Sequence, residues 1–392
     1  MDTMPKKPIR ILFDAHALLG KKTGVGYYVD QLISELARQH VDDVEIVGYY
    51  HNFLYRKHIS GLPAGPNIRY RQVAFMPGQV VNLLRRFHIL LPVELLTLTK
   101  ADFILYPNYL GLASLFKTPS ASVVHDLSFI DLPEYLSERN LHDLQSFMPA
   151  QIARSTFLVA VSEFTKTRIR QEFDVPAEAI LVTPAAPDTP LSIPVATRRH
   201  ILDELGVHGN YILTLGTVEP RKNLPNMLAA YLQLPKKLRQ EYTFVVAGKI
   251  GWKCEQEVAE LKRLKQAGEN VLHLGYVTDE QRASLFANAT FFTSASHYEG
   301  FGMPALEAMS YGTACAMSDI AVFHEAGGSA SRYFNQEDPT SIAKTWEALL
   351  NNPLQLKKLA VAGKRRADSY SWKAVADSLY ERIVKTLTEE KS

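Results

Sequence analysis

The chain has 392 residues, more than one hydrophobic core usually organises, so its length predicts two domains. The 43 Lys and Arg residues nearly balance the 41 Asp and Glu residues, and a formal net charge of +2 excludes the broad basic surface typical of nucleic-acid-binding proteins. The two cysteines, Cys254 and Cys315, have neither disulfide-scaffold nor zinc-ligand spacing, which favours a protein of the reducing cytoplasm.

The N-terminal segment lacks the features of a signal peptide. Met1–Arg10 is short and basic and leads directly into a strand-like run. The longest uncharged apolar stretch, Phe103–Phe116, contains Pro107 and Asn108 and is too short to cross a bilayer. We therefore expect no transmembrane anchor.

Short apolar runs alternate with amphipathic helical stretches in the first half of the chain. This alternation predicts a parallel sheet with helices on both faces. Tyr28, Leu32 and Leu36 have helical spacing and predict a helix over Gly26–Arg38 with one buried face. The expected strands are Ile9–Phe13, Val44–Tyr50, Phe103–Tyr106, Ala121–His125, Phe157–Val161 and Ile180–Thr183.

The segment Val80–Leu98 mixes apolar residues with cationic ones. It holds Arg85, Arg86 and His88 among valines and leucines, and such a mixture is typical of a segment that lies on a membrane surface. A pair of core-packed helices interrupted at Pro92 would give the same pattern. The sequence leaves both interpretations open.

A proline-rich segment separates the two halves of the chain. Thr183–Val195 holds four prolines among small and polar residues, which is typical of a linker. We expect one domain over residues 1–190 and a second over 191–370. Residues 371–392, with a helix expected over Trp372–Leu387, are long enough to pack back on the first domain. The expected strands of the second domain are Tyr211–Leu215, Thr243–Ala247, Val271–Leu274, Thr290–Thr293 and Thr313–Met317.

Residues that directly follow a strand are the first candidates for function, because ligands of open parallel sheets bind beyond the carboxyl ends of the strands. Gly24 and Gly26 follow the first strand and open a helix, where bare backbone can approach an anion. A tight turn would use the same glycines, and Val29 stands where a dinucleotide fingerprint needs a third glycine. His125 ends an apolar run and can hydrogen-bond a polar substrate, while a structural role stays open.

Two adjacent cations follow the first strand of the second domain. Arg221 and Lys222 come after Pro220, which stiffens the loop, and precede a helix whose N-cap is expected at Asn223. An anion bound there would meet a guanidinium, an ammonium and the positive end of a helix. The position after a strand favours this anion site over a solvated basic turn.

Two glutamates eight positions apart, Glu299 and Glu307, flank a glycine-rich helix start. Pro304 suits the first turn of a helix, so Gly302 and Met303 would present backbone N–H groups at its positive end. The two carboxylates would accept hydrogen bonds from hydroxyl groups on either side of a bound anion. The arrangement fits a diphosphate that carries hydroxyls on both sides, which describes a sugar nucleotide.

With these motifs the chain resembles the retaining glycosyltransferases of family four. That family has the α/β GT-B architecture, in which two Rossmann-like domains with parallel sheets face each other across a central cleft. The resemblance covers nearly the whole chain and extends to bacterial mannosyltransferases that build O-antigen or exopolysaccharide. The motifs that carry it are Thr23–Tyr28, Val124–Phe129, Val161–Thr165, Gly216–Asn223 and the pair Glu299 and Glu307 in its GFGMP context.

The resemblance implies a role for each candidate residue. The first domain would bind the acceptor and the second the nucleotide-sugar donor, with Arg221 and Lys222 neutralising the diphosphate. Glu299 would hold hydroxyls of the transferred sugar, and Glu307 would bind the ribose diol. The remaining implied positions are His125 at the anomeric centre, Gly24 and Gly26 on the acceptor or phosphate side, Ser162 among the donor contacts, Gly248 and Val277 near the nucleobase, and the backbone of Phe301, Gly302 and Met303 at the sugar or its β-phosphate.

The implied reaction transfers a hexose with retention, and the departing diphosphate assists the acceptor hydroxyl on the same face of the sugar. The expected donor is GDP-mannose, the acceptor a glycan or lipid-linked glycan, and the product a cell-surface polysaccharide such as lipopolysaccharide. Because the chain has no Asp-x-Asp motif, no metal is expected. No cofactor is expected either, since the nucleotide sugar is a substrate. Nucleic acid is not an expected partner. The protein would be cytoplasmic, and a peripheral position on the inner face of the membrane stays open.

A UDP-sugar donor and a GT-B sugar-nucleotide epimerase stay open as alternatives. An NAD-dependent oxidoreductase is disfavoured by the incomplete glycine fingerprint. A non-enzymatic sugar-binding protein would leave the two cations and the two glutamates without a purpose.

Overall fold

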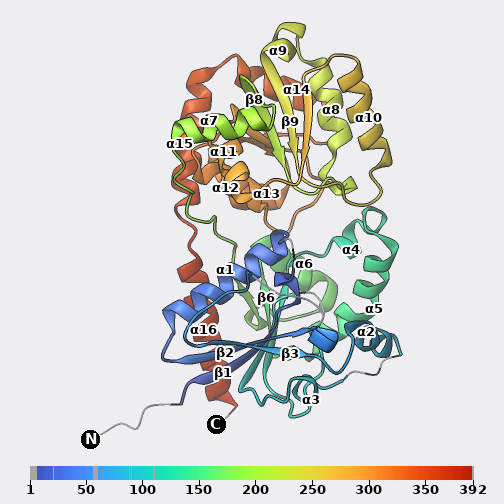
Figure 1. Ribbon diagram of the computed structural model, residues 1–392, viewed down its shortest axis with the longest axis vertical. Helices are drawn as coiled ribbons and strands as arrows, with labels where there is room; N and C mark the ends of the chain where they lie inside the picture. The colour runs from blue at the N-terminus through green and yellow to red at the C-terminus, as the bar shows by residue number, and fades with distance from the viewer. Residues whose placement is uncertain are drawn as a thin grey trace, which may run out of the picture. The chain divides into compact units, whose positions relative to one another are not determined.

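The computed structural model describes residues 7–20, 22–55, 61–87, 89, 91–108 and 111–390. Contacts within the chain divide it into two compact units, each built on its own parallel sheet (Figure 1). In the described ranges, no helix combines the length and the apolar character needed to cross a membrane. The first unit comprises Met1–Leu127, His142–Ala185 and Ser371–Ser392, and the second comprises Ser128–Leu141 and Ala186–Tyr370.

The sheet of the first unit has seven strands within the described residues, in the order β3-β2-β1-β4-β5-β6-β7. All of its neighbouring strands are parallel. β4, β5 and β6 are buried along their whole length, as expected for central strands covered on both faces. The strands are β1 (Ile9–Asp14), β2 (Val44–His51), β3 (Ile68–Val73), β4 (Phe103–Tyr106), β5 (Ser120–Val124), β6 (Phe157–Ala160) and β7 (Ile180–Val182).

The last helix of the chain belongs to the first unit, where α16 (Trp372–Glu389) packs against α1 (Gly24–Gln39). The rings of Tyr28 and Trp372 meet edge to face with centroids 5.3 Å apart, and Leu379 and Ile383 on α16 are fully buried. Residues from the far end of the sequence therefore complete this core. The other helices are η1 (His16–Leu18), η2 (Phe53–Tyr55), α2 (Gly78–Arg86), α3 (Val93–Thr97), α5 (Glu138–Arg154), α6 (Glu163–Phe173) and η4 (Ala177–Ala179).

The sheet of the second unit has six parallel strands among the described residues, in the order β10-β9-β8-β11-β12-β13. Its strand order has the same pattern as that of the first sheet. The first strand lies in the middle, the next two strands lie on one side of it, and the later strands lie on the other side. The strands are β8 (Asn210–Leu215), β9 (Tyr242–Ala247), β10 (Val271–Gly275), β11 (Phe291–Ser294), β12 (Cys315–Ser318) and β13 (Ser331–Phe334).

Aromatic side chains fill the core of the second unit. Trp346 is fully buried against Phe244 and Phe291, and its indole N–H donates to Oγ1 of Thr293 over 3.1 Å. This bond satisfies the one polar atom that the indole brings into the core. The helices are α4 (Ser128–Asp131), η3 (Pro133–Tyr135), α7 (Val195–Glu204), η5 (Pro220–Lys222), α8 (Leu224–Gln233), α9 (Lys236–Glu241), α10 (Glu255–Gln266), α11 (Asp279–Asn288), α12 (Met303–Ser310), α13 (Ala321–Gly327), η6 (Gly328–Ala330), α14 (Pro339–Leu350) and α15 (Pro353–Ala367).

The predicted α/β class with two Rossmann-like domains is confirmed, and every strand expected from the sequence is present with ends that differ by at most two residues. Two further strands, β3 and β13, were not expected, and each lies at the edge of its sheet. The contact-based division falls at Ala185, near the start of the proline-rich segment and five residues before the expected boundary at 190, and it groups Ser128–Leu141 with the second unit.

The segment Val80–Leu98 folds as two helices on either side of Pro92, which is the N-cap of α3. Val93 and Leu96 are buried, so α3 contributes to the core of the first unit. His88 and the side chains of Arg85 and Arg86 lie outside the described part of the structure.

Candidate active site

Strand order brings the candidate residues of the second unit together at one edge of its sheet. β8 and β11 are neighbours although β9 and β10 lie between them in the chain. The loop after β8 carries Arg221 and Lys222, and the loop after β11 carries Glu299. Parallel strands end at the same edge, and ligands of open sheets bind where the strand order reverses. The topology thereby joins side chains that are 77 and 78 positions apart.

Arg221 and Lys222 both donate to the Glu299 carboxylate. Nη1 of Arg221 lies 2.9 Å from Oε2 of Glu299 and 2.8 Å from the Tyr298 carbonyl oxygen, and Nζ of Lys222 donates to Oε1. Oγ of Ser296 also donates to Oε1, over 2.7 Å. Burial by itself raises the pKa of Glu299, but the Lys222 ammonium and the Arg221 guanidinium outweigh it and hold the pKa at about 2. Glu299 is therefore ionised at every physiological pH.

A second buried carboxylate, Glu219, holds Arg221 from another side. Nε of Arg221 lies 2.7 Å from Oε1 of Glu219, whose side chain is only 6% exposed. Two cations thus face two buried carboxylates, and the network fixes the cations before any anion arrives. Side chains held in this way need no reordering when a ligand binds.

Two glycines allow the loops after β8 and β9 to touch. A Cβ on Gly248 would lie 1.7 Å from the Gly216 carbonyl oxygen, and the φ angles of the two glycines are 144° and 151°. No other residue fits at Gly248 without displacing the loop that carries Arg221 and Lys222. Gly248, predicted near the nucleobase, therefore has a demonstrable packing role beside the cationic loop.

The helix start predicted around Pro304 is confirmed in α12, where Gly302 is the N-cap and Met303 the first residue. Gly302 has a φ angle of 94°, and a Cβ there would lie 2.7 Å from the Phe323 ring. The Phe301 side chain is buried and packs edge to face on Tyr370. Phe301 can therefore offer a ligand its backbone but not its ring, and the first N–H groups of α12 point to a site for an anion.

Glu307 lies within α12 and is 8% exposed. Its burial raises its pKa to about 7, although the guanidinium of Arg282 on α11 opposes the shift. Nη1 of Arg282 lies 3.5 Å from Oε1 of Glu307. The two glutamates of the motif thus differ in charge state, since Glu299 is always ionised and Glu307 titrates near neutral pH.

The second residue expected near the nucleobase, Val277, follows β10. Val277 is half-buried and precedes Thr278, which caps α11 through a capping box with Gln281. Nε2 of His273 lies 2.9 Å from the Gly248 carbonyl oxygen, so β10 is tied to the loop after β9. Val277 therefore belongs to the same edge of the sheet as Gly248.

His125 follows β5 in the first unit and is 8% exposed. Its Nε2 lies 2.9 Å from the Pro107 carbonyl oxygen, so the Nε2–H tautomer donates there, and its ring packs edge to face on Tyr28. Burial lowers the pKa of His125, against the smaller opposing effects of the Pro107 carbonyl and Asp126. The imidazole is therefore neutral at pH 7 and acts through hydrogen bonds and not through charge.

The other first-unit candidates have clear local roles. Ser162 is fully buried, and its hydroxyl caps α6 by accepting from the Thr165 N–H over 2.9 Å. Gly26 is buried where a Cβ would lie 2.7 Å from the Ala17 carbonyl oxygen, whereas a Cβ on Gly24 would meet nothing within 4 Å. Gly24 is thus the one of the pair whose backbone is open to a ligand, and the Ser162 hydroxyl serves the start of α6.

The helix after the cationic loop begins where expected, with Asn223 as the N-cap residue of α8, but the Asn223 side chain makes no capping bond. Its φ angle is 56°, and its Nδ2 donates to the Gln336 carbonyl over 2.8 Å. Sequence reasoning also missed the roles of Glu219, Ser296 and Arg282, which contact motif side chains. Within the described ranges, no group of three His, Cys, Asp or Glu residues is arranged to hold a metal ion.

Family models match both halves of the chain. The model described as Glycosyltransferase Family 4 matches residues 22–190, and the model described as Glycosyl transferases group 1 matches residues 204–366. The second match contains every candidate residue of the second unit, from Arg221 to Glu307.

The relatives agree with these matches. O-antigen chain mannosyltransferase B of Escherichia coli is 27% identical over 378 residues, which are 93% of this chain and 96% of that protein. Sucrose-phosphate synthase of Thermosynechococcus elongatus has a TM-score of 0.74 at 16% identity, over 97% of this chain and all of its own. HepE of Anabaena, solved in complex with UDP and glucose, has a TM-score of 0.69 at 16% identity, over 96% of this chain and all of its own. The solved structures show the fold, the two family models cover the units that carry it, and together they place this chain among the GT-B glycosyltransferases.

Proposed function

We propose that this chain is a retaining mannosyltransferase that moves mannose from GDP-mannose to a glycan acceptor in the synthesis of a cell-surface polysaccharide. The name of the E. coli relative that spans nearly the whole chain supports mannose as the sugar and a glycan as the acceptor. The observation that carries the transferase function is the pairing of Arg221 and Lys222 with Glu299 next to the start of α12.

The donor would bind along these residues in a fixed order. Its diphosphate would meet Arg221, Lys222 and the first N–H groups of α12, which together offset the negative charge. Glu299, ionised and held in place, would accept hydrogen bonds from hydroxyls of the mannose. Glu307 would accept from the two ribose hydroxyls of the nucleotide.

The chemical step breaks the bond between the anomeric carbon and the diphosphate oxygen. The acceptor hydroxyl forms the new bond on the same face, and its proton passes to the departing phosphate. Stabilising that departing anion is the main task of the protein, and the two fixed cations perform it. Glu299, with a pKa of about 2 and three donors on its carboxylate, is a weak nucleophile, which supports a route without a covalent enzyme intermediate.

His125 would serve the acceptor side of the reaction. The neutral imidazole suits a hydrogen bond to a sugar hydroxyl near the reacting carbon, because a cation there would oppose an oxocarbenium-like transition state. Gly24, with open space around its Cα, would let the acceptor or a phosphate approach the start of α1.

A panel of nucleotide sugars tests the proposal. Thermal unfolding is followed with GDP-mannose, UDP-glucose and ADP-glucose, because a ligand that binds the folded state raises the unfolding temperature. We expect GDP-mannose to give the largest rise and the α-linked product to form when a mannan-type acceptor is added. Anomeric retention is read from the NMR coupling constant of the product. A β-linked product, or no rise with any of the three, contradicts the proposal.

A UDP-sugar donor is the second candidate, supported by the bound UDP of the Anabaena structure. The same panel separates the two, since UDP-glucose would then give the larger rise. An epimerase would interconvert the donor in the absence of any acceptor, whereas a transferase would leave the sugar unchanged under that condition.

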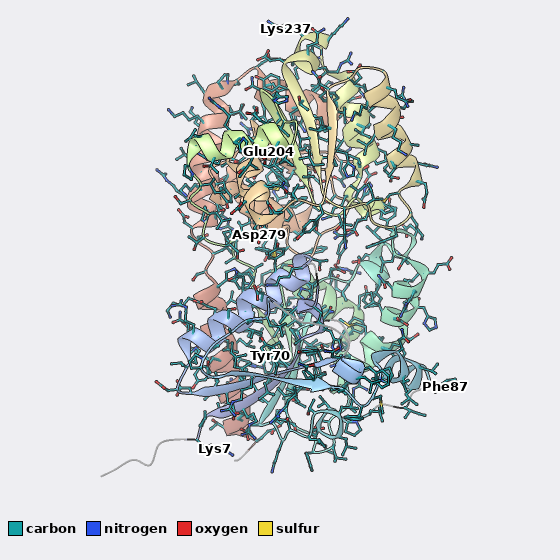
Figure 2. All side chains as sticks on the ribbon, viewed as in Figure 1. Lys7, Tyr70, Phe87, Glu204, Lys237 and Asp279 are labelled. Carbon is teal, nitrogen blue, oxygen red and sulfur yellow. The ribbon has the colours of Figure 1, made fainter. Side chains whose placement is uncertain are left out.

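We also propose a peripheral membrane contact on the first unit, which would suit a lipid-linked acceptor. Leu83, Phe87 and Ile89 expose 53%, 68% and 51% of their surfaces, and Phe87 lies at the outer rim of its unit (Figure 2). The sequence adds Arg85 and Arg86 to the same short stretch. Exposed apolar side chains next to cations favour the interface of an anionic bilayer.

Co-sedimentation with vesicles tests this contact. Vesicles of phosphatidylcholine with phosphatidylglycerol should bind the protein, and Leu83→Ser combined with Phe87→Ser should reduce the bound fraction several-fold. Replacing Arg85 and Arg86 by Glu should have the same effect. Leu354→Ser is the matched control, because Leu354 is 75% exposed on α15 of the other unit. Equal binding of all variants contradicts the contact.

A further inference from the structure

Arg282 on α11 lies among three carboxylates from three parts of the second unit. Besides Glu307 on α12, its guanidinium faces Asp279 at the start of α11 and Asp188 in the segment before α7. Nη2 of Arg282 lies 3.3 Å from Oδ1 of Asp279 and 4.0 Å from Oδ2 of Asp188. The Arg282 side chain is only 17% exposed, so its charge is poorly screened by water.

The three carboxylates differ in what they need from Arg282. Asp188 and Asp279 are 32% and 59% exposed, so water stabilises their charges. Glu307 is buried, and an ionised buried carboxylate requires a partner or becomes neutral. Of the groups that influence Glu307, Arg282 lowers its pKa while burial and the two aspartates raise it. A fourth group, the phenol of Tyr311 at the C-cap of α12, is uncharged because burial raises its pKa.

The other elements that pack on α12 carry titratable groups with partners of their own. Lys364 on α15 donates to the Ser310 carbonyl over 3.1 Å, at the end of α12. His324 on α13 lies 2.6 Å from Asp319. The Cys315 thiol on β12 stays neutral, because burial raises its pKa. Arg282 is therefore the cation through which the charge of Glu307 is stabilised.

We propose that Arg282 is a positioning residue for ribose recognition, which favours the charged form of the Glu307 carboxylate and holds it in place so that it accepts hydrogen bonds from both hydroxyls of the nucleotide ribose. The inference rests on the proposed role of Glu307 in donor binding. A neutral carboxyl would carry a proton on one oxygen and would lose one of its two charge-assisted acceptors. Because ribose binding favours the ionised form, the nucleotide binds more tightly above the pKa of Glu307 than below it.

Titration calorimetry with nucleoside diphosphates tests the inference between pH 6 and pH 9. The probe is GDP, or UDP if the wild-type protein binds UDP more tightly, and its 2′,3′-dideoxy form is the matched ligand without ribose hydroxyls. We expect Arg282→Gln to weaken binding of the ribonucleotide by roughly tenfold at pH 7, the loss of one charge-assisted hydrogen bond. The loss should shrink toward pH 9, because a higher pH favours the ionised form of Glu307 also in the absence of the Arg282 cation.

Further variants separate positioning from general damage. Arg282→Lys keeps the charge and should restore most of the affinity at pH 7. The dideoxy nucleotide should bind all variants alike. Arg263→Gln removes an arginine of an exposed pair on α10 and should change neither ligand.

Each result bears on the inference. An equal loss for the ribonucleotide and its dideoxy form, or a loss in Arg282→Gln that is the same from pH 6 to pH 9, overturns it. If Glu307→Ala abolishes the preference for the ribonucleotide while Arg282→Gln leaves it intact, the role of Glu307 stands and only the role of Arg282 fails. If the wild-type protein binds no nucleoside diphosphate, the proposed function fails together with this inference.

Discussion

Nη1 of Arg221 lies 2.9 Å from Oε2 of Glu299, so a cation assigned to the leaving diphosphate is held by the carboxylate assigned to the sugar. The residues assigned to the sugar and to the diphosphate, the two groups joined by the bond that breaks, thus belong to one hydrogen-bonded network. Lys222 donates to the other oxygen of the same carboxylate.

We expect Arg221→Ala and Lys222→Ala to lower the turnover number by roughly a hundred- to a thousand-fold, the usual loss when one preorganised partner of a developing anion is removed. Initial rates at saturating donor measure the effect. Each variant also removes one of the two cations that stabilise the negative charge of the buried Glu299. Thermal unfolding should therefore show a moderate loss of stability. Arg239→Ala, which breaks the Arg239–Glu269 pair elsewhere in the unit, controls for that loss of stability and should keep full turnover. Rates within tenfold of wild type would contradict the assignment.

Catalysis is expected to need no divalent metal. Arg221 and Lys222 supply the positive charge that a metal would otherwise bring to the diphosphate, and the sequence has no Asp-x-Asp motif. Turnover measured in excess EDTA should therefore equal turnover without it. Activity that disappears with EDTA and returns with magnesium or manganese would show that a metal carries the leaving group.

Substitutions of the two glutamates should weaken the binding of different ligands. Glu307→Ala is expected to weaken binding of GDP and of GDP-mannose alike, because both carry the ribose. Glu299→Ala should weaken GDP-mannose by roughly ten- to a hundred-fold and GDP much less, because only the intact donor carries the sugar. Calorimetric titration of each variant with both ligands measures this. Equal losses for both ligands in both variants would refute the assignment.

Stability should depend on pH through Glu307 in a direction opposite to that of most carboxylates. Its pKa rises from an ordinary 4.5 to about 7 on folding, so between these values the folded state binds a proton that the unfolded state has lost. The free energy of unfolding therefore falls as pH rises through this window, by at most about 3 kcal/mol. Glu307→Gln removes this titration. The free energy of unfolding of the variant, measured relative to that of the wild type, should therefore be higher at pH 8 than at pH 5.

Urea unfolding at the two pH values measures the change, and Glu299→Gln is the opposed control. The pKa of Glu299 is lowered to about 2, so its ionised form stabilises the fold fully above pH 4.5, and this stabilisation is lost progressively as pH falls from 4.5 to about 2. Glu299→Gln should therefore be less stable than wild type at both pH 5 and pH 8. A stability difference for Glu307→Gln that does not change with pH would argue against the raised pKa.

Gly248→Ala should damage the cationic loop more than an ordinary glycine substitution does. The new Cβ would stand 1.7 Å from the Gly216 carbonyl oxygen, so the backbone must move. Gly312→Ala is the matched control, because its φ is 75° and a Cβ there meets nothing within 4 Å, so it costs only backbone strain of about 1–2 kcal/mol. We expect Gly248→Ala to lower both the unfolding temperature and the GDP affinity, and Gly312→Ala to lower only the former. Equal effects of the two would contradict a role in the site.

The central strands were predictable from sequence because burial on both faces requires continuous apolar runs, as in Ala121–Val124. β3 and β13 were not, because an edge strand needs only one paired side and tolerates polar residues. β3 reads IRYRQV and is half exposed, and β13 reads SRYF. Neither pattern differs from that of a polar loop until a neighbouring strand pairs with it.

The motif side chains of the site could be predicted because they follow strands. Arg282, which supports Glu307, was missed because it does not follow a strand. Arg282 lies inside α11, where an arginine has the appearance of any solvated helix residue, and only the packing of α11 near α12 brings it to Glu307. Asn223 is the N-cap residue that its type predicts, but its amide donates to the Gln336 carbonyl instead of capping α8. Spacing in sequence predicts which atoms follow a strand, whereas contacts between helices depend on the completed packing.

The packing of Trp372 on Tyr28 has a consequence for how the chain folds during synthesis. The apolar face of α1 that includes Tyr28 leaves the ribosome early, and the helix that covers it follows more than 300 residues later. Until then the second unit can close its own core, because all of its strands are already present. The unit translated second is thus the first that can finish folding, and the exposed face of α1 is the surface that a chaperone would have to shield in the meantime.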